Sequence, residues 1–238
     1  MSFVKTVIPI TLFVLAPALR AQDASAGQTD PNAPKGTNPP EPVHKRIFGI
    51  IPNYRTAPTL QHYEPLTARE KFKIATQDAF DPGNIVLAAA AGGLAQLSNF
   101  NPSFGQGAAG FASYFGTSYA DAVIGDYMSE AVFPALLHQD PRYFRKGTGS
   151  GMSRFGYALD RLLVTRNDSG KRAFNYSEIG GNSAAVAISM AYYADNRDAG
   201  TAAYLLSLQL AADAASNIMK EFWPDIHRKF FERKQQHP

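Results

Sequence analysis

The chain of 238 residues contains no cysteine. This absence excludes disulfide bonds, a thiolate nucleophile, an iron–sulfur cluster and a zinc–thiolate site. An anchor of the bacterial lipoprotein type also requires a cysteine, so that route to a membrane is closed. The fold must therefore be stabilised by its packed core alone.

A strong excess of charge is lacking as well. The formal net charge is +3, and the first 21 residues contain Lys5 and Arg20 but no acidic residue. The rest of the chain therefore carries 21 basic and 20 acidic residues. Nucleic-acid binding requires a concentrated basic surface, so we expect no nucleic-acid partner.

Familiar catalytic motifs are missing too. The chain has neither a Gly-x-x-x-x-Gly-Lys-[Ser/Thr] loop nor a His-Glu-x-x-His pair. The segment 147–151 comes close to Gly-x-Ser-x-Gly, but no strand precedes it, and we interpret it as a flexible loop. The sequence indicates no cofactor and no metal site.

The N-terminus, residues 1–21, is typical of a secretory signal peptide. Lys5 precedes a short apolar run from Thr6 to Leu15, and small residues permit cleavage after Ala18 or Ala21. An uncleaved anchor is the alternative, but the run is shorter than the roughly 20 residues of a membrane span. We expect an exported protein, located in the periplasm or at the outer membrane.

Three further segments follow this predicted leader. Residues 22–44 are rich in Pro, Asn, Asp, Gly and Ser, which predicts a disordered linker. Residues 45–226 form the predicted helical domain, which opens with an extended arm over 45–55. Residues 227–238 are a basic tail with aromatic residues, either solvated or lying on a membrane surface.

Capping signals and prolines mark most of the helices. Thr67 and Glu70 form a capping box for a first helix that ends at Asp81–Pro82, and Asn175 with Glu178 predicts another that runs to about residue 193. Further helices are expected at about 83–98, 106–138 and 152–164, with a kink at Pro134.

The last helix has the clearest apolar pattern. Steps of three and four predict a packing seam of Leu205, Leu208, Ala212, Ala215, Met219 and Phe222. A polar stripe of Gln209, Asp213, Ser216 and Lys220 would then face water, and Trp223–Pro224 would end the helix. Two-residue alternation is scarce, so we predict an all-α fold, a compact bundle of about six helices.

Rows of small residues spaced four apart are the distinctive feature of these helices. Such rows allow helix backbones to approach closely, and we expect Gly/Ala helix packing. The rows are Ala88 and Gly92; Ala112, Gly116 and Ala120; and Gly181, Ala185 and Ser189.

The segment from Pro82 to Ala120 contains no charged residue over 39 positions. It could be a helical pair buried in the core or a hairpin that dips into a membrane. A helix over 83–98 would be about 24 Å long, shorter than the roughly 30 Å hydrocarbon core, which favours the buried pair.

Candidate catalytic residues lie on the long helix and at its end. Asp126 and Glu130 are four residues apart and share a face, so they could share a proton or a hard metal ion such as Ca²⁺ or Mg²⁺. A solvated stripe would show the same spacing, and no ligand spacing with histidine completes a metal site. His138 could be a general base or could cap the last carbonyls of the helix.

A basic segment follows at residues 142–172. Arg142 and Arg145 are candidate ligands of phosphate or lipid headgroups. Pairing with Glu130, Glu178 and Asp198 inside the bundle is the alternative. The basic residues of the segment are Arg142, Arg145, Lys146, Arg154, Arg161, Arg166, Lys171 and Arg172.

Four stretches of the chain resemble a family of exported acidobacterial-type proteins of unknown function. They are the residues 48–55 (FGIIPNYR), 136–144 (LLHQDPRYF), 164–170 (VTRNDSG) and 220–226 (KEFWPDI). This resemblance covers most of the chain after the leader. It implies export but no activity and no catalytic residues.

The sequence as a whole favours an exported helical protein with a binding or structural role. Membrane lipid or another envelope protein is the expected partner. The alternatives are an enzyme acting on a phosphate-bearing or lipid substrate and a membrane-embedded helical partner protein.

Overall fold

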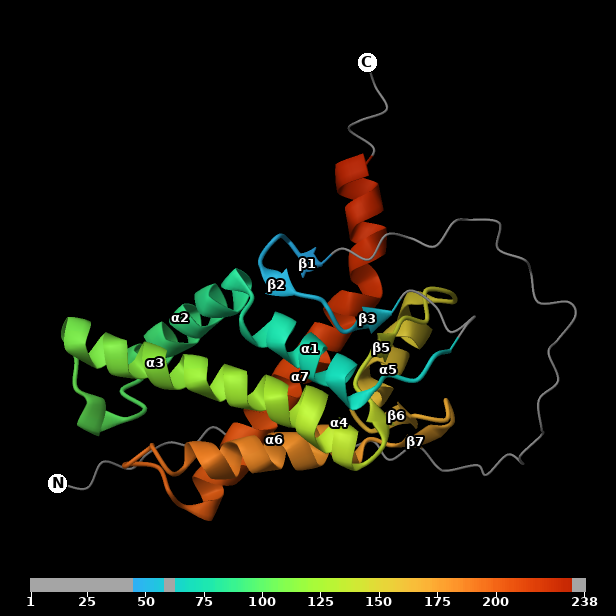
Figure 1. Cartoon of the computed structure of the whole chain (residues 1–238). Helices are drawn as coiled ribbons and strands as arrows, with labels where there is room; N and C mark the ends of the chain where they lie inside the picture. The colour runs from blue at the N-terminus through green and yellow to red at the C-terminus, as the bar shows by residue number, and fades with distance from the viewer. Residues whose placement is uncertain (1–44, 58–62, 233–238) are drawn as a thin grey trace, which may run out of the picture. The chain divides into compact units, whose positions relative to one another are not determined.

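A computed structural model describes residues 45–57 and 63–232, which all belong to one compact unit, Pro39–Pro238. The predicted signal peptide, the linker and the last six residues of the tail lie outside these ranges. Helices dominate the described part, as the all-α prediction requires (Figure 1). They are α1 (Ala68–Ala79), α2 (Pro82–Leu97), α3 (Gly107–Asp126), α4 (Phe133–Leu136), α5 (Gly151–Asp160), α6 (Tyr176–Ser189) and α7 (Ala199–His227).

Short strands connect and brace the helices. β1 (Arg46–Ile47) and β2 (Ile51–Pro52) form a hairpin, and β3 (Thr56–Ala57) pairs in parallel with β5 (Tyr143–Phe144). β4 (Gln139–Asp140), β6 (Val164–Asn167) and β7 (Arg172–Phe174) form a three-stranded sheet. The predicted helix over 152–164 therefore ends four residues early, since Val164 already belongs to β6.

The predicted helix starts agree with the structure. The Thr67 hydroxyl accepts a hydrogen bond from the Glu70 amide, and the Glu70 carboxylate accepts one from the Thr67 amide, which completes the capping box. Asn175 caps α6 by accepting from the Glu178 amide, but the Glu178 side chain is buried instead of returning to the cap. The Glu178 carboxyl group instead interacts with Asp213 and Arg55 in the core.

The long helix is continuous through residue 136 but not uniform. Between α3 and α4 the turn Tyr127–Val132 is a π-helix, just before Pro134. Proline has no amide hydrogen to offer the carbonyl four residues back, and a widened turn accommodates that loss. The π-turn also carries Glu130, which is fully buried there.

Helix α7 corrects the predicted packing seam. Leu208, Ala212 and Ala215 face outward, whereas Asn217 and Lys220 are buried. The helix also continues through Pro224 to His227. The apolar stripe is thus on the outside of this helix because its polar stripe meets other buried polar groups.

Small residues produce close helix contacts at two of the three predicted rows. A Cβ added to Gly181 would lie 2.7 Å from the Cα of Ser129, and one added to Gly92 would lie 2.8 Å from the Phe115 amide nitrogen. The third row is wrong as a packing row, since Ala112 and Gly116 are exposed and a Cβ at Gly116 would meet nothing within 4 Å.

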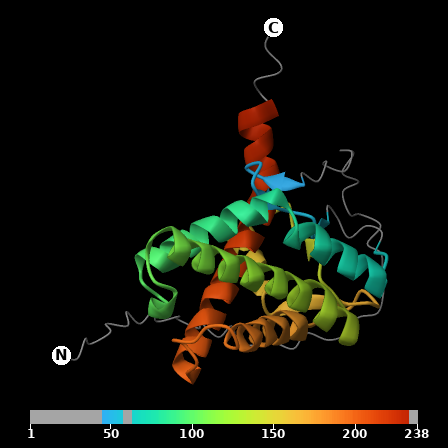
Figure 2. The ribbon, with the colours of Figure 1, turned by 60° about the vertical axis from the view of Figure 1, so that its left-hand side comes forward.

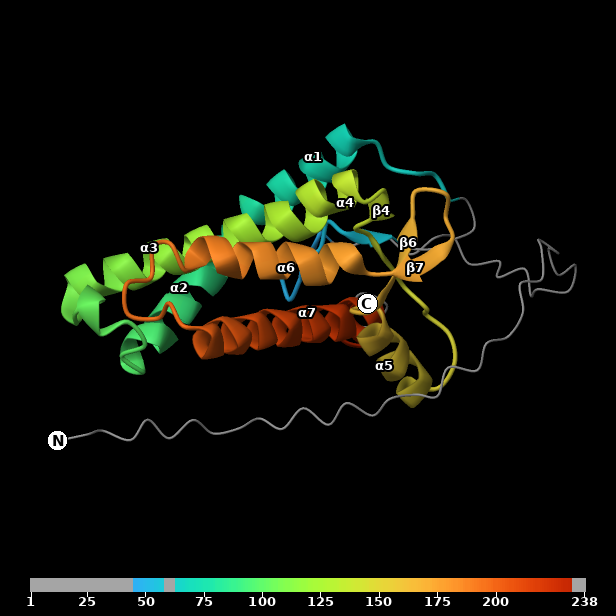
Figure 3. The same ribbon diagram turned by 90° about the horizontal axis from the view of Figure 1, so that it is seen from below.

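The helices are arranged as adjacent pairs. α2 lies along α3, and the π-turn after α3 packs between α1 and α6 (Figure 2). α7 lies beside α6 and contacts α5 (Figure 3). Among the described residues, no helix combines the length and the hydropathy needed to cross a membrane.

Candidate functional site

Charged side chains occupy the interior where α1, α3, α6 and α7 meet. The Arg55 guanidinium lies 3.0 Å from the Glu130 carboxylate, and both side chains are almost fully buried. Together with this pair, four more carboxyl groups and one more cation interact in the same region. We call this set the buried charge cluster: Arg55, Asp78, Asp126, Glu130, Glu178, Asp213 and Lys220.

Burial sets the protonation of this cluster. Loss of hydration raises the pKa of Asp126 to about 8, and the nearby Asp78 carboxylate acts in the same direction. Burial also raises the pKa of Glu130 well above its ordinary value, although Arg55 opposes that rise. For the Lys220 ammonium, burial and then the charge of Arg55 lower the pKa to about 8.

Glu178 and Asp213 form a carboxyl pair inside the cluster. Burial, followed by the charge of Asp213 and a hydrogen bond to it, raises the pKa of Glu178 to about 8. Asn182 donates to Asp213 over 2.9 Å. The Glu178 carboxyl group therefore keeps its proton to a higher pH than an exposed glutamate does.

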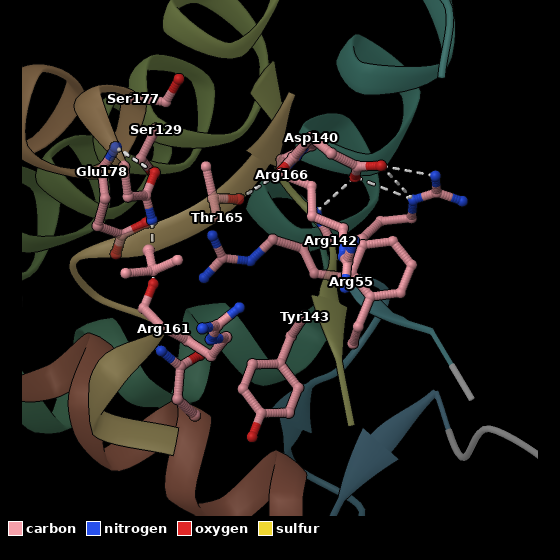
Figure 4. A pocket seen from close by; sticks show the side chains of 15 residues that line it. Arg55, Ser129, Asp140, Arg142, Tyr143, Arg161, Thr165, Arg166, Ser177 and Glu178 are labelled. Carbon is pink, nitrogen blue, oxygen red and sulfur yellow. Dashed lines mark hydrogen bonds and ion pairs between the residues drawn. The ribbon is translucent and has the colours of Figure 1, made fainter. Parts of the chain in front are cut away.

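A pocket adjoins the buried charge cluster next to the strands β4, β5 and β6 (Figure 4). Its volume is about 30 Å³, room for one or two water molecules or a small ion. Arg55 and Glu178 belong both to the pocket wall and to the buried charge cluster. The first turn of α6 also contributes, and a helix N-terminus favours negative charge.

Four arginines line this pocket: Arg55, Arg142, Arg161 and Arg166. Asp140 and Glu178 are the acidic residues of the lining. Asp140 accepts three hydrogen bonds from the Arg142 guanidinium, at 3.0, 3.2 and 2.6 Å. The lining therefore contains more basic than acidic side chains.

Aromatic rings lie against three of these guanidinium groups. The Phe144 ring lies 5.1 Å from the guanidinium carbon of Arg142 and 5.9 Å from that of Arg166. Arg161 lies over the Tyr157 ring at 4.5 Å and pairs with Asp160. Stacking of this kind fixes a planar cation without using its N–H donors.

Two of the pocket's guanidinium donors have no protein partner. The Nε atoms of Arg161 and Arg166 are buried and make no hydrogen bond within the described part of the chain. A buried charged N–H without an acceptor is costly, so such a group indicates a missing acceptor. Both residues line the same small cavity.

Arg145 has a different environment and does not line this pocket. Its guanidinium donates to the Glu221 carbonyl at 2.8 Å and to Asp225 at 2.9 Å. The Glu221 carboxylate, itself fully buried, accepts from Arg154 and from the amides of Lys146 and Gly147. This network fixes the loop after β5 onto α7.

The predicted site residues therefore separate into four places. Asp126 and Glu130 are in the buried charge cluster, which excludes the solvated stripe. His138 is exposed, 82% for its side chain, with Nδ1 3.6 Å from Asp168, away from both carboxylates. Arg142 lines the pocket, and Arg145 is paired with α7.

The sequence predicts no site role for Arg55. It predicts Glu178 only as a capping residue or as an ion-pair partner of an arginine. Arg55 lies in an apolar arm, where only its isolation from other charges distinguished it. The internal pairing predicted for the basic segment is present, but with Asp140, Asp160, Glu221 and Asp225. Glu130 pairs with Arg55 instead.

The described residues contain no group of three or more His, Asp or Glu side chains placed to hold a metal ion. Comparison of the chain with models of protein families, with curated proteins and with solved structures finds no match.

Proposed function

We propose that this protein binds a small oxyanion, such as a phosphate or carboxylate group, in the arginine-lined pocket. The observation that carries the proposal is that Arg161 and Arg166 both line one small cavity, and that the buried Nε–H group of each finds no acceptor among the described residues. Charge-assisted hydrogen bonds from guanidinium groups are the strongest contacts that proteins make to phosphate and carboxylate.

The small volume of the cavity limits the size of the ligand that can enter it. A volume of about 30 Å³ admits one anionic group but not a drug-sized molecule, which would need at least roughly 300 Å³. The ligand is therefore a free anion or the anionic end of a larger molecule that remains outside. With the leader predicted over 1–21, binding would take place in the periplasm or at the outer membrane.

Titration calorimetry with inorganic phosphate and with acetate tests this function. We expect Arg166→Gln to weaken phosphate binding at least roughly ten-fold, the value of one charge-assisted hydrogen bond. Arg172→Gln is the matched control, since Arg172 faces Arg166 across the β6–β7 hairpin but does not line the pocket.

Two outcomes would reject the proposal. One is a wild-type protein that binds neither anion. The other is equal binding by the Arg166→Gln and Arg172→Gln variants, because the pocket would then contribute nothing.

An enzyme acting on a phosphate-bearing substrate is the second candidate, favoured by one observation. Glu178 is a carboxylic acid with a pKa of about 8 on the wall of an arginine-lined pocket, which suits a proton donor. Release of phosphate from a phosphate monoester, lost in Glu178→Gln, would favour this candidate over simple binding.

A further inference from the structure

The most exposed residues of four helices are uncharged. On α2, α3, α6 and α7, every residue classed as exposed is apolar, small or a neutral polar residue. Their charged residues, such as Asp126, Glu178 and Lys220, are buried or half-buried, and the Asp225 side chain near the end of α7 is 31% exposed. In contrast, α1 exposes Arg69, Glu70 and Lys73.

Large aliphatic side chains mark the outer face of α2. Leu97 is 86% exposed and Leu94 is 69% exposed, and Val86 lies on the same side of the helix. The opposite side, with Ala88 and Gly92, packs on α3. A helix that is apolar all round is normally buried all round, so the outer face of α2 lacks its cover here.

The neutral polar groups of this surface bond to their own helices. Ser113, Ser183 and Ser207 each donate a hydroxyl hydrogen to the carbonyl four residues earlier. At the tip between α2 and α3, Gln96 donates to the Gly107 carbonyl, and Gln106 donates to the Gln96 carbonyl. These donors need neither water nor a partner protein.

Together, these features favour one kind of molecule as the contact partner of the outer faces of these helices. A protein partner would use hydrogen bonds and a polar rim, and Ser113, Ser183 and Ser207 already donate within their own helices. Acyl chains require the opposite, a surface without charge whose polar groups are satisfied internally. We infer that the surface of α2, α3, α6 and α7 lies against the acyl chains of a lipid bilayer.

The end of α7 fits the same arrangement. Arg228 and Lys229 follow the helix and are exposed, as are Phe230 and Phe231. Basic and aromatic residues are typical of the headgroup level of a membrane, next to the acyl region.

Flotation of the full chain with vesicles tests the inference. The vesicles are phosphatidylcholine alone and phosphatidylcholine with phosphatidylglycerol. We expect the protein to float with both, with little effect of high salt, because the contact surface carries no charge. Leu97→Glu should lower the vesicle-bound fraction by about ten-fold or more, since a carboxylate is poorly tolerated in lipid.

Leu136→Glu is the matched control. Leu136 is 70% exposed but lies on α4, outside the four helices, and two residues before His138, whose ring contacts Asp168. Its replacement should therefore leave flotation unchanged. Every variant keeps the same N-terminal segment, so the effect of that segment cancels. Arg166→Gln should also float normally, which separates this inference from the anion pocket.

Three results would overturn the inference. The first is a wild-type protein that stays unbound. The second is equal flotation of Leu97→Glu and Leu136→Glu. The third is a lipid-free dimer, seen by light scattering, that Leu97→Glu dissociates, since a second copy of the chain would then be the cover.

Discussion

At the scale of the residue, the protein buries ionisable groups in its interior, where the charged form costs free energy. Asp126 receives a 3.2 Å hydrogen bond from the Asn84 amide group, but burial in the bundle still raises the pKa of its carboxyl group. A buried carboxylate that lacks full compensation keeps its proton instead of ionising. The core is therefore stable partly because some of its acids are neutral.

The pH dependence of stability follows from these acids. Asp126 and Glu178 bind their protons more tightly in the folded than in the unfolded protein, with pKa values of about 8. Their contribution is fully present below pH 4 and is lost as the pH rises towards 8. The lowered pKa of Lys220 acts in the opposite direction, but only above about pH 8.

We therefore expect the melting temperature to fall between about pH 5 and pH 8, and Asp126→Asn to reduce that fall. Asparagine can still accept the hydrogen bond from Asn84, so the variant should fold. Thermal denaturation across this range checks the prediction. A melting temperature that rises steadily towards pH 8, or an unchanged slope in Asp126→Asn, would contradict it.

At the scale of the element, the glycines of these helices occupy two different environments. Gly181 is needed because α6 approaches the backbone of Ser129 too closely for any side chain. Gly116 has open space around its α-carbon and faces outward on α3. The four-residue spacing is the same in both rows, so spacing alone could not distinguish a contact from an open surface.

Alanine substitutions at these two positions should have opposite effects. Gly181→Ala forces the two backbones apart and should lower the free energy of unfolding by roughly 1–3 kcal/mol. Gly116→Ala meets no atom and should raise it by up to about 1 kcal/mol, since alanine is the better helix former. Urea denaturation of both variants measures the difference, and a destabilised Gly116→Ala would show that this face is packed.

At the scale of the whole molecule, the sequence predicts the helices better than it predicts their orientation. The capping residues Thr67 and Asn175 and the break at Asp81–Pro82 are local signals, and the structure uses all of them. The strands β6 and β7 could not be predicted in this way, because with four and three residues they are too short to show a two-residue alternation. They pair with each other as a hairpin, and only β6 also pairs with the distant strand β4.

The inward face of α7 could not be predicted for a different reason. The rule that apolar stripes face the core places Leu208 and Ala212 inside, whereas the structure places Asp213 and Lys220 against the other members of the buried charge cluster. The site depends on this reversal, since charges from five separate segments meet only after the chain has folded. Export remains a prediction from the leader.

The central claim of this account is that α2, α3, α6 and α7 present an uncharged surface to lipid. The chain has no native cysteine, so single cysteines can be labelled cleanly with an environment-sensitive fluorophore, at Leu97→Cys on α2 and at Thr148→Cys on the exposed loop after β5. Adding phosphatidylcholine vesicles should shift the emission at position 97 to the blue and leave position 148 unchanged. No shift at position 97, or the same shift at both positions, would contradict the claim.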